Sequence, residues 1–167
     1  MREKTGKIVL TALFAALVFV FTLLSVPAPL VGNVNLGDGM VLLCAFVLGG
    51  PWAAVAAGLG AGLCDLTNGY AMYAPATFLI KALMAAVAVL LYRLLTRLHL
   101  PRKAALPVAG LSGELIMVGG YFLYEATFLS YGLGAAANIP FNAIQGALGM
   151  VLALVMYTVL YKMKLAK

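Results

Sequence analysis

The stretch "DLTNGYAMYAPATFLIKAL", Asp65–Leu83, combines the two features that decide the fold of this chain. Its second half opens a long apolar run, "TFLIKALMAAVAVLLY", of the kind that crosses a membrane as a helix. Its first half is a polar turn, and one lysine follows inside the apolar run. A lysine in such a run either snorkels to a nearby surface or is needed inside the protein. The polar members are Asp65, Asn68, Tyr70, Tyr73 and Lys81.

The composition of the whole chain agrees with this membrane-like run. Hydrophobic residues make up 65% of the 167 residues and charged residues 10%, and the mean hydropathy is +1.08. In soluble domains about a quarter of the residues are charged. We therefore predict an all-α integral membrane protein that forms a single transmembrane domain over residues 1–167. At about 20 residues per spanning helix, the chain has room for five or six helices and no soluble domain.

The basic residues predict the orientation of these helices. Ten of the eleven Lys and Arg residues fall in three clusters, at the two termini and in one connecting segment. The positive-inside rule assigns all three clusters, and so both termini, to the cytoplasm. This distribution also argues against nucleic-acid binding as the reason for the net charge of +6. The clusters are Arg2, Lys4 and Lys7; Arg93, Arg97, Arg102 and Lys103; and Lys162, Lys164 and Lys167.

Apolar runs between Pro, Gly and Asn breaks predict six transmembrane helices. The second is short, about 15 Å at 1.5 Å per residue, whereas the membrane core is about 30 Å thick. The second and third helices therefore either form a thinned hairpin or partly re-enter the membrane. Small residues in the third and sixth helices, such as Gly58, Gly62 and Gly149, predict close internal packing. The expected helices are Ile8–Val26, Gly39–Leu48, Pro51–Leu66, Ala76–Arg97, Ala104–Leu129 and Pro140–Tyr161.

The polar residues of these helices converge on the outer half of the protein. Lys81 and Glu125 each lie about five residues inside a helix, or roughly 6–9 Å below the outer surface. Ionisable groups at such depth are normally paired or functional, so two interpretations stand. Lys81 and Glu125 either form an ion pair that locks their helices, or Lys81 contacts a ligand. The abundance of neighbouring Asn and Tyr side chains favours a ligand, because a structural pair does not need them.

Signatures of catalysis are largely absent. "GNVNLGD" has the glycine spacing of a phosphate-binding loop, but Asp38 stands where that loop has lysine. No Cys and His residues occur at metal-ligand spacing. We therefore expect neither an enzyme nor a metal or organic cofactor. Glu114, nearer the inner end of its helix, is predicted to pair with Arg102 or Lys103.

Several short motifs between Asn35 and Leu83 occur together in a known family. They are an N-L-G-D start of the second helix, a G-P break before the third, a D-L-x-x-G-Y turn and a T-F-x-I-K start of the fourth. In these motifs, and in its size and six helices, the chain resembles the substrate-binding S components of energy-coupling factor (ECF) vitamin transporters. Within that group it is most similar to the branch assigned to pyridoxine or to the hydroxymethylpyrimidine precursor of thiamine.

The resemblance implies high-affinity capture of a water-soluble vitamin or precursor at the outer face of the bacterial cytoplasmic membrane, and its delivery inward. It also implies a transmembrane T component and two cytoplasmic ATPase subunits as partners. Ala12 and Ala16 have the A-x-x-x-A spacing with which the family docks on the T component. The substrate-binding residues that we predict are Asn35, Asp38, Asp65, Asn68, Tyr70, Tyr73, Lys81, Tyr121, Glu125, Asn138, Asn142 and Gln145.

Three alternatives stay open. A carboxylate-bearing vitamin becomes plausible if Lys81 is not neutralised by Glu125. An independent transporter or channel needs a continuous polar path, yet the inner halves of the fourth and sixth helices are nearly all apolar. An intramembrane enzyme would use Asp65, Glu125 or Lys81, but no paired acid and base lie on one helix.

Overall fold

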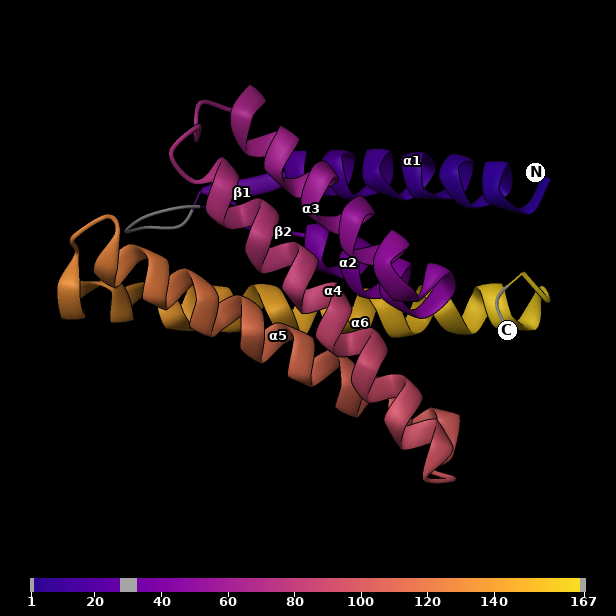
Figure 1. The fold of residues 1–167 in the computed structure, drawn as a ribbon. Coiled ribbons are helices and arrows are strands. Elements are labelled where there is room, and N and C mark those ends of the chain that lie inside the picture. Colours follow the sequence, from indigo (N-terminus) through magenta and orange to yellow (C-terminus); the bar gives the residue numbers. More distant parts are fainter. Residues whose placement is uncertain (1, 28–32, 166–167) are drawn as a thin grey trace.

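The computed structural model describes residues 2–27 and 33–165, with side chains from residue 4 onward. Over this part of the chain the fold is a bundle of six α-helices with a small two-stranded sheet (Figure 1). The helices are α1 (Arg2–Leu23), α2 (Gly37–Leu48), α3 (Gly50–Thr67), α4 (Ala74–Arg97), α5 (Arg102–Thr127) and α6 (Ile139–Lys162). The strands are β1 (Ser25–Pro27) and β2 (Asn33–Asn35), and the 3₁₀ helix η1 (Gly132–Asn138) precedes α6.

All six predicted helices are present, with shifted ends. The largest shift is in α1, which begins at Arg2 instead of Ile8 and ends at Leu23 instead of Val26. Two predicted loops contain regular structure that the sequence pattern did not reveal. The first holds β2 and the end of β1, whose residues Ser25 and Val26 fall in the predicted first helix. The two strands pair antiparallel with Ser25 opposite Asn35, and the second loop holds η1. Segments this short carry too few residues to show a hydrophobic period.

Helix α2 lies inside the bundle. It contacts α1, α3, α4, α5 and α6, and the residues from Gly37 to Phe46 are all buried. A helix that is apolar around its whole circumference is expected to be surrounded by protein or lipid, and here the surroundings are other helices. The short length of α2 is therefore compatible with its burial.

Four helical segments of the described chain are long and apolar enough to cross a membrane. They are Lys4–Leu23, Ala74–Arg97, Arg102–Thr127 and Gly132–Lys162. The last of these joins η1 and α6. Helix α2, with 12 residues, is too short for that length criterion.

Glycines bring the helices close together, as predicted for α3 and α6. A Cβ atom at Gly58 of α3 would lie 2.8 Å from the backbone oxygen of Phe78 in α4. On another face of α3, a Cβ atom at Gly60 would collide with α1 at Ala15. In α6, a Cβ atom at Gly149 would lie 2.8 Å from the Cβ atom of Asp38. Small residues therefore permit the backbone contacts that hold α1, α3 and α4 together and seat α2 on α6.

The two ends of the bundle differ in character (Figure 1). Both termini and the basic α4–α5 connection lie towards one end, on the right of the view. The β1–β2 sheet and the α3–α4 and α5–α6 connections lie towards the other. This arrangement agrees with cytoplasmic termini and with the positive-inside rule. It also gathers the polar loops at a single end, which the basic clusters predict to be the outer end.

Candidate functional site

The outer end of the bundle encloses a cavity of about 90 Å³. A cavity of about 10–15 Å³ already holds one water molecule, so this space is much larger than a packing defect. Ten of the twelve predicted binding residues line it: Asn35, Asp65, Asn68, Tyr70, Tyr73, Lys81, Tyr121, Glu125, Asn142 and Gln145. The remaining two, Asp38 and Asn138, are not in the lining but bond to residues that are.

Six further residues line the cavity that the sequence analysis missed: Thr22, Ser25, Asn33, Cys64, Thr77 and Phe141. Ser25 and Asn33 lie on the β1–β2 sheet, which was not predicted. Thr77 could have been predicted from the sequence, because it lies four residues before Lys81 and therefore on the same face of α4.

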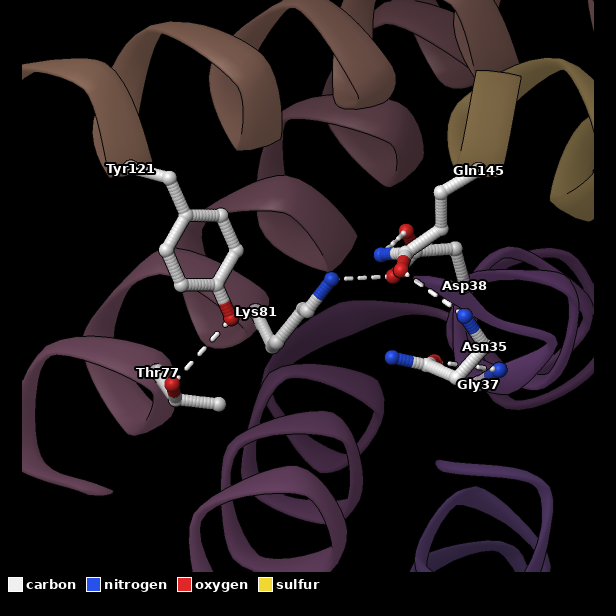
Figure 2. A network of polar contacts seen from close by, with 7 residues as sticks. All are labelled: Asn35, Gly37, Asp38, Thr77, Lys81, Tyr121 and Gln145. Atoms are coloured by element: carbon white, nitrogen blue, oxygen red, sulfur yellow. Dashed lines mark hydrogen bonds and ion pairs between the residues drawn. The ribbon is translucent and has the colours of Figure 1, made fainter. Parts of the chain in front are cut away.

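Lys81 is buried at the base of the cavity, where it forms an ion pair with Asp38 of α2 (Figure 2). Of the two interpretations that the sequence left open for Lys81, the ion pair with Glu125 is not formed among the described residues. The second oxygen of Asp38, Oδ2, accepts a hydrogen bond of 2.7 Å from Gln145 Nε2. Gln145 Oε1 in turn accepts one of 3.0 Å from the backbone N–H of Asn35. The network ties α2, α4, α6 and β2 together at the base of the cavity.

The sequence at the start of α2 explains the position of Asp38. The side chain of Asn35 accepts a hydrogen bond of 2.9 Å from the Gly37 N–H, which fixes the chain as it enters the helix. Gly37 leaves room there for Thr22, whose hydroxyl a Cβ atom would strike. Asp38 then lies in the first turn, where the helix dipole stabilises a negative charge.

Tyr121 of α5 covers Lys81 from the other side (Figure 2). Its ring centroid lies 5.3 Å from Lys81 Nζ, within the range of a cation–π contact. Its hydroxyl donates a hydrogen bond of 3.1 Å to Thr77 Oγ1. The lysine is thus held between a carboxylate and an aromatic face.

Glu125, also on α5, is a second buried carboxylate of the site. Its Oε2 accepts a hydrogen bond of 2.8 Å from Asn138 Nδ2, and its Oε1 accepts a longer one of 3.4 Å from the Tyr73 hydroxyl. Burial and then the charge of Glu125 raise the pKa of Tyr73, which lies just before α4. The phenol therefore remains a donor at neutral pH. Asn138 orients Glu125 without lining the cavity.

Aromatic rings continue from the cavity to the surface. Tyr73 makes edge contacts with Tyr70 and Tyr124, at ring-centroid distances of 6.4 and 5.6 Å. Tyr124 stacks on Phe128 and donates a hydrogen bond of 2.5 Å to the backbone oxygen of Met72. These contacts join the α3–α4 connection to the end of α5, so one wall of the cavity presents aromatic surface.

Glu114 does not pair as predicted. It is buried, and among the described residues neither of its carboxylate oxygens has a hydrogen-bond donor. It packs against α6, where a Cβ atom at Gly146 would lie 2.8 Å from Glu114 Oε2. Arg102 instead places its guanidinium 4.5 Å from the ring centroid of Tyr161. The prediction considered only nearness along the chain, whereas the orientation of α5 turns Glu114 inward.

A metal site finds no support in the described part of the chain. Within residues 2–27 and 33–165, no three His, Cys, Asp or Glu side chains are grouped so that they could hold an ion. Cys44 and Cys64 are both buried as free thiols. The residues that line the cavity offer hydrogen bonding, charge and aromatic contact.

Comparison with known proteins identifies structures and families that share this fold. A solved structure described as "Structure and mechanism of the S component of a bacterial ECF transporter" aligns with a TM-score of 0.72 and 19% sequence identity, covering 96% of this chain and 98% of that chain. At that identity the match shows a shared fold. A search of curated proteins found no match. The family model for "ECF-type riboflavin transporter, S component" matches residues 2–162. Because that match covers nearly the whole chain, the protein belongs to the family of ECF-type transporter S components that this model describes.

Proposed function

We propose that this protein captures a small water-soluble vitamin or precursor in the outer cavity, as the substrate-specific subunit of an ECF importer in a bacterial cytoplasmic membrane. The observation that carries the proposal is the cavity itself. It collects charged, amide and phenolic side chains in a chain whose residues are 65% hydrophobic. A pocket with a few placed polar groups and aromatic walls is typical of small-molecule sites.

The substrate that we propose is pyridoxine or hydroxymethylpyrimidine. One small heteroaromatic ring would contact Tyr73 or Tyr121, while amide and carboxylate groups bond its substituents. Riboflavin is the second candidate, because the matching family model bears that name. All three compounds contain rings with several hydrogen-bonding groups, so the polar and aromatic side chains of the cavity suit each of them.

Thermal unfolding of the purified protein in detergent tests ligand capture. The panel contains pyridoxine, hydroxymethylpyrimidine, riboflavin, thiamine, nicotinate and pantothenate. A ligand at 100 times its Kd adds about 2.7 kcal/mol to the free energy of unfolding, which is a measurable rise in Tm. A panel in which no vitamin or precursor raises the Tm contradicts the proposal.

Helix α1 supplies the surface that we propose for the T component. Ala12 and Ala16 are both exposed, whereas Phe14 and Val18 face the bundle. At Gly60, α3 approaches α1 at Ala15 and Val18, whereas Ala12 and Ala16 stay exposed on the surface of the bundle. An exposed pair of small residues one turn apart lets a second helix approach closely in a membrane.

The alternative, an independent transporter or channel, predicts a different dependence on energy. Uptake of the stabilising ligand into vesicles is expected only when the T component and two ATPase subunits are present with ATP. Uptake by this chain alone, at the rate seen with the partners, would favour the alternative.

A further inference from the structure

The acidic residues of this chain are concentrated within the bundle. Of five Asp and Glu residues in the sequence, four lie within the bundle: Asp38, Asp65, Glu114 and Glu125. Asp65 is half-buried and the other three are buried. Of the basic side chains that the structure describes, only Lys81 lies among them. Acidic groups therefore outnumber basic groups four to one in the part of the protein where water screens charge least.

The charge of Lys81 is already compensated. Asp38 forms an ion pair with it, and the second oxygen of Asp38 is satisfied by Gln145. Tyr121 presents its ring to the same ammonium group. A ligand carboxylate that binds Lys81 would place a second negative charge beside Asp38 at a single ammonium group, and two carboxylates that share one site repel each other.

Two acidic side chains face the cavity without an ion-pair partner of their own. Asp65 from α3 and Glu125 from α5 both line it. Among the described residues neither belongs to an ion pair. The two donors to Glu125, from Tyr73 and Asn138, are neutral.

One buried polar atom without a partner adds to this imbalance. In the described chain the atoms of this kind are Arg102 Nη1, both carboxylate oxygens of Glu114 and Oδ1 of Asn138, and of these three residues Asn138 is the one that bonds to Glu125 in the cavity lining. A buried polar group without a partner is unfavourable, so Oδ1 of Asn138 adds an unfilled acceptor beside Glu125.

From this imbalance we infer that the cavity selects a ligand with a positive or N–H-donating nitrogen, which Asp65 and Glu125 bind, and disfavours anionic ligands. The class is an amine-bearing ring, a protonated ring nitrogen or an amino-substituted nitrogen heterocycle. The inference rests on the proposed function in taking the cavity as the ligand site. Hydrogen bonds from such nitrogens to carboxylates are charge-assisted and stronger than neutral ones.

Ligands that share a ring but differ in charge test the inference. The pyridine set contains pyridoxamine, pyridoxine and the anion 4-pyridoxate. The flavin set contains riboflavin and its anionic 5′-phosphate. One further probe, 4-amino-5-hydroxymethyl-2-methylpyrimidine, represents the aminopyrimidines. Dissociation constants are measured by calorimetry on the full chain in detergent. We expect the tightest probe to carry an amino or protonated nitrogen, and each anionic probe to bind at least tenfold more weakly than its uncharged or amine counterpart. An anionic probe that binds as tightly as its counterpart overturns the inference but leaves ligand capture intact. A folded protein that binds no probe overturns both.

Isosteric variants test whether the two acidic side chains cause the preference for amine-bearing over anionic ligands. Asp65→Asn and Glu125→Gln keep the shape of the cavity and remove its charge, so the discrimination against anions is expected to fall at least threefold in each. Glu114→Gln is the matched control, because it removes a buried carboxylate that does not line the cavity. It is expected to leave the discrimination unchanged. Discrimination that persists in the Asp65→Asn, Glu125→Gln double variant overturns the inference.

Discussion

At the scale of single residues, Lys81 serves the fold as well as the site. The sequence placed Lys81 and Glu125 at one depth, and the two do lie on one cavity. Depth along separate helices does not specify which side chains touch, because each helix can rotate about its axis. The rotation that occurs brings Lys81 to Asp38, which lies 43 positions earlier in the chain.

Removing one member of this pair should destabilise the protein. Asp38→Asn leaves a buried ammonium group without a counter-charge, and breaking a buried pair in this way costs about 3–5 kcal/mol. Chemical denaturation in detergent measures the change in unfolding free energy. The double variant Asp38→Asn, Lys81→Met should recover much of the loss, because no unpaired charge remains. Asp65→Asn, which breaks no ion pair of the described chain, is the control. A loss below about 1 kcal/mol for Asp38→Asn, which is within the usual range for a single hydrogen bond, would contradict a structural role for the pair.

At the scale of helices, packing depends on which glycines meet a neighbour. Gly58 of α3 faces the backbone of Phe78, whereas a Cβ atom added at Gly119 of α5 would meet no atom of the described chain within 4 Å, apart from its own helix backbone and chain neighbours. Both glycines lie inside helices. The same Gly→Ala substitution therefore has opposite expected effects at the two positions.

Gly58→Ala should destabilise the protein, because overpacking typically costs about 1–3 kcal/mol. Gly119→Ala should be neutral or stabilising by up to about 1 kcal/mol, because alanine favours a helix over glycine. Thermal unfolding of the two variants side by side measures the difference. Equal melting temperatures would show that α3 and α4 can separate without loss of stability.

Helix α1 offers a test of assembly. Ala12→Leu with Ala16→Leu is expected to leave ligand affinity unchanged and to abolish co-purification with the T component, because the added side chains keep the partner helix away. Ala143 and Ala147 on α6 form an exposed pair with the same spacing, so their double leucine variant is a matched control that should assemble normally. Retained assembly of the α1 variant would remove Ala12 and Ala16 from the partner surface.

At the scale of the whole molecule, the orientation of the bundle in the membrane determines on which side of the membrane the cavity opens. Leu133 lies in η1, within the α5–α6 connection, and Leu98 lies in the α4–α5 connection. Both are exposed, and the two connections lie towards opposite ends of the bundle (Figure 1). Cys44 and Cys64 are buried, so labelling of introduced cysteines has little background. We expect a membrane-impermeant maleimide to label Leu133→Cys in intact cells, and Leu98→Cys only after permeabilisation. The reverse pattern would place the cavity on the cytoplasmic side.

Much of the architecture was predictable because it depends on local chemistry. Long apolar runs must form helices in lipid, where each backbone group needs an internal partner. Basic clusters determine orientation, and Pro and Gly mark the breaks between helices. The same reasoning predicted twelve substrate-binding residues, and ten of them line the cavity. It missed β1, β2 and η1, which are too short for a periodic signal.

The sequence by itself thus determined the membrane class, the six helices and the gathering of polar groups at one end of the bundle. Only the tertiary structure decided that α2 is enclosed by the other helices, that Lys81 pairs with Asp38, and that Glu114 lies inward with no hydrogen-bond donor among the described residues. The physical reason is that composition and period act within one segment, whereas these contacts depend on the rotation and spacing of helices from distant parts of the chain. Those rotations are set by close approaches at residues such as Gly58, Gly60 and Gly149.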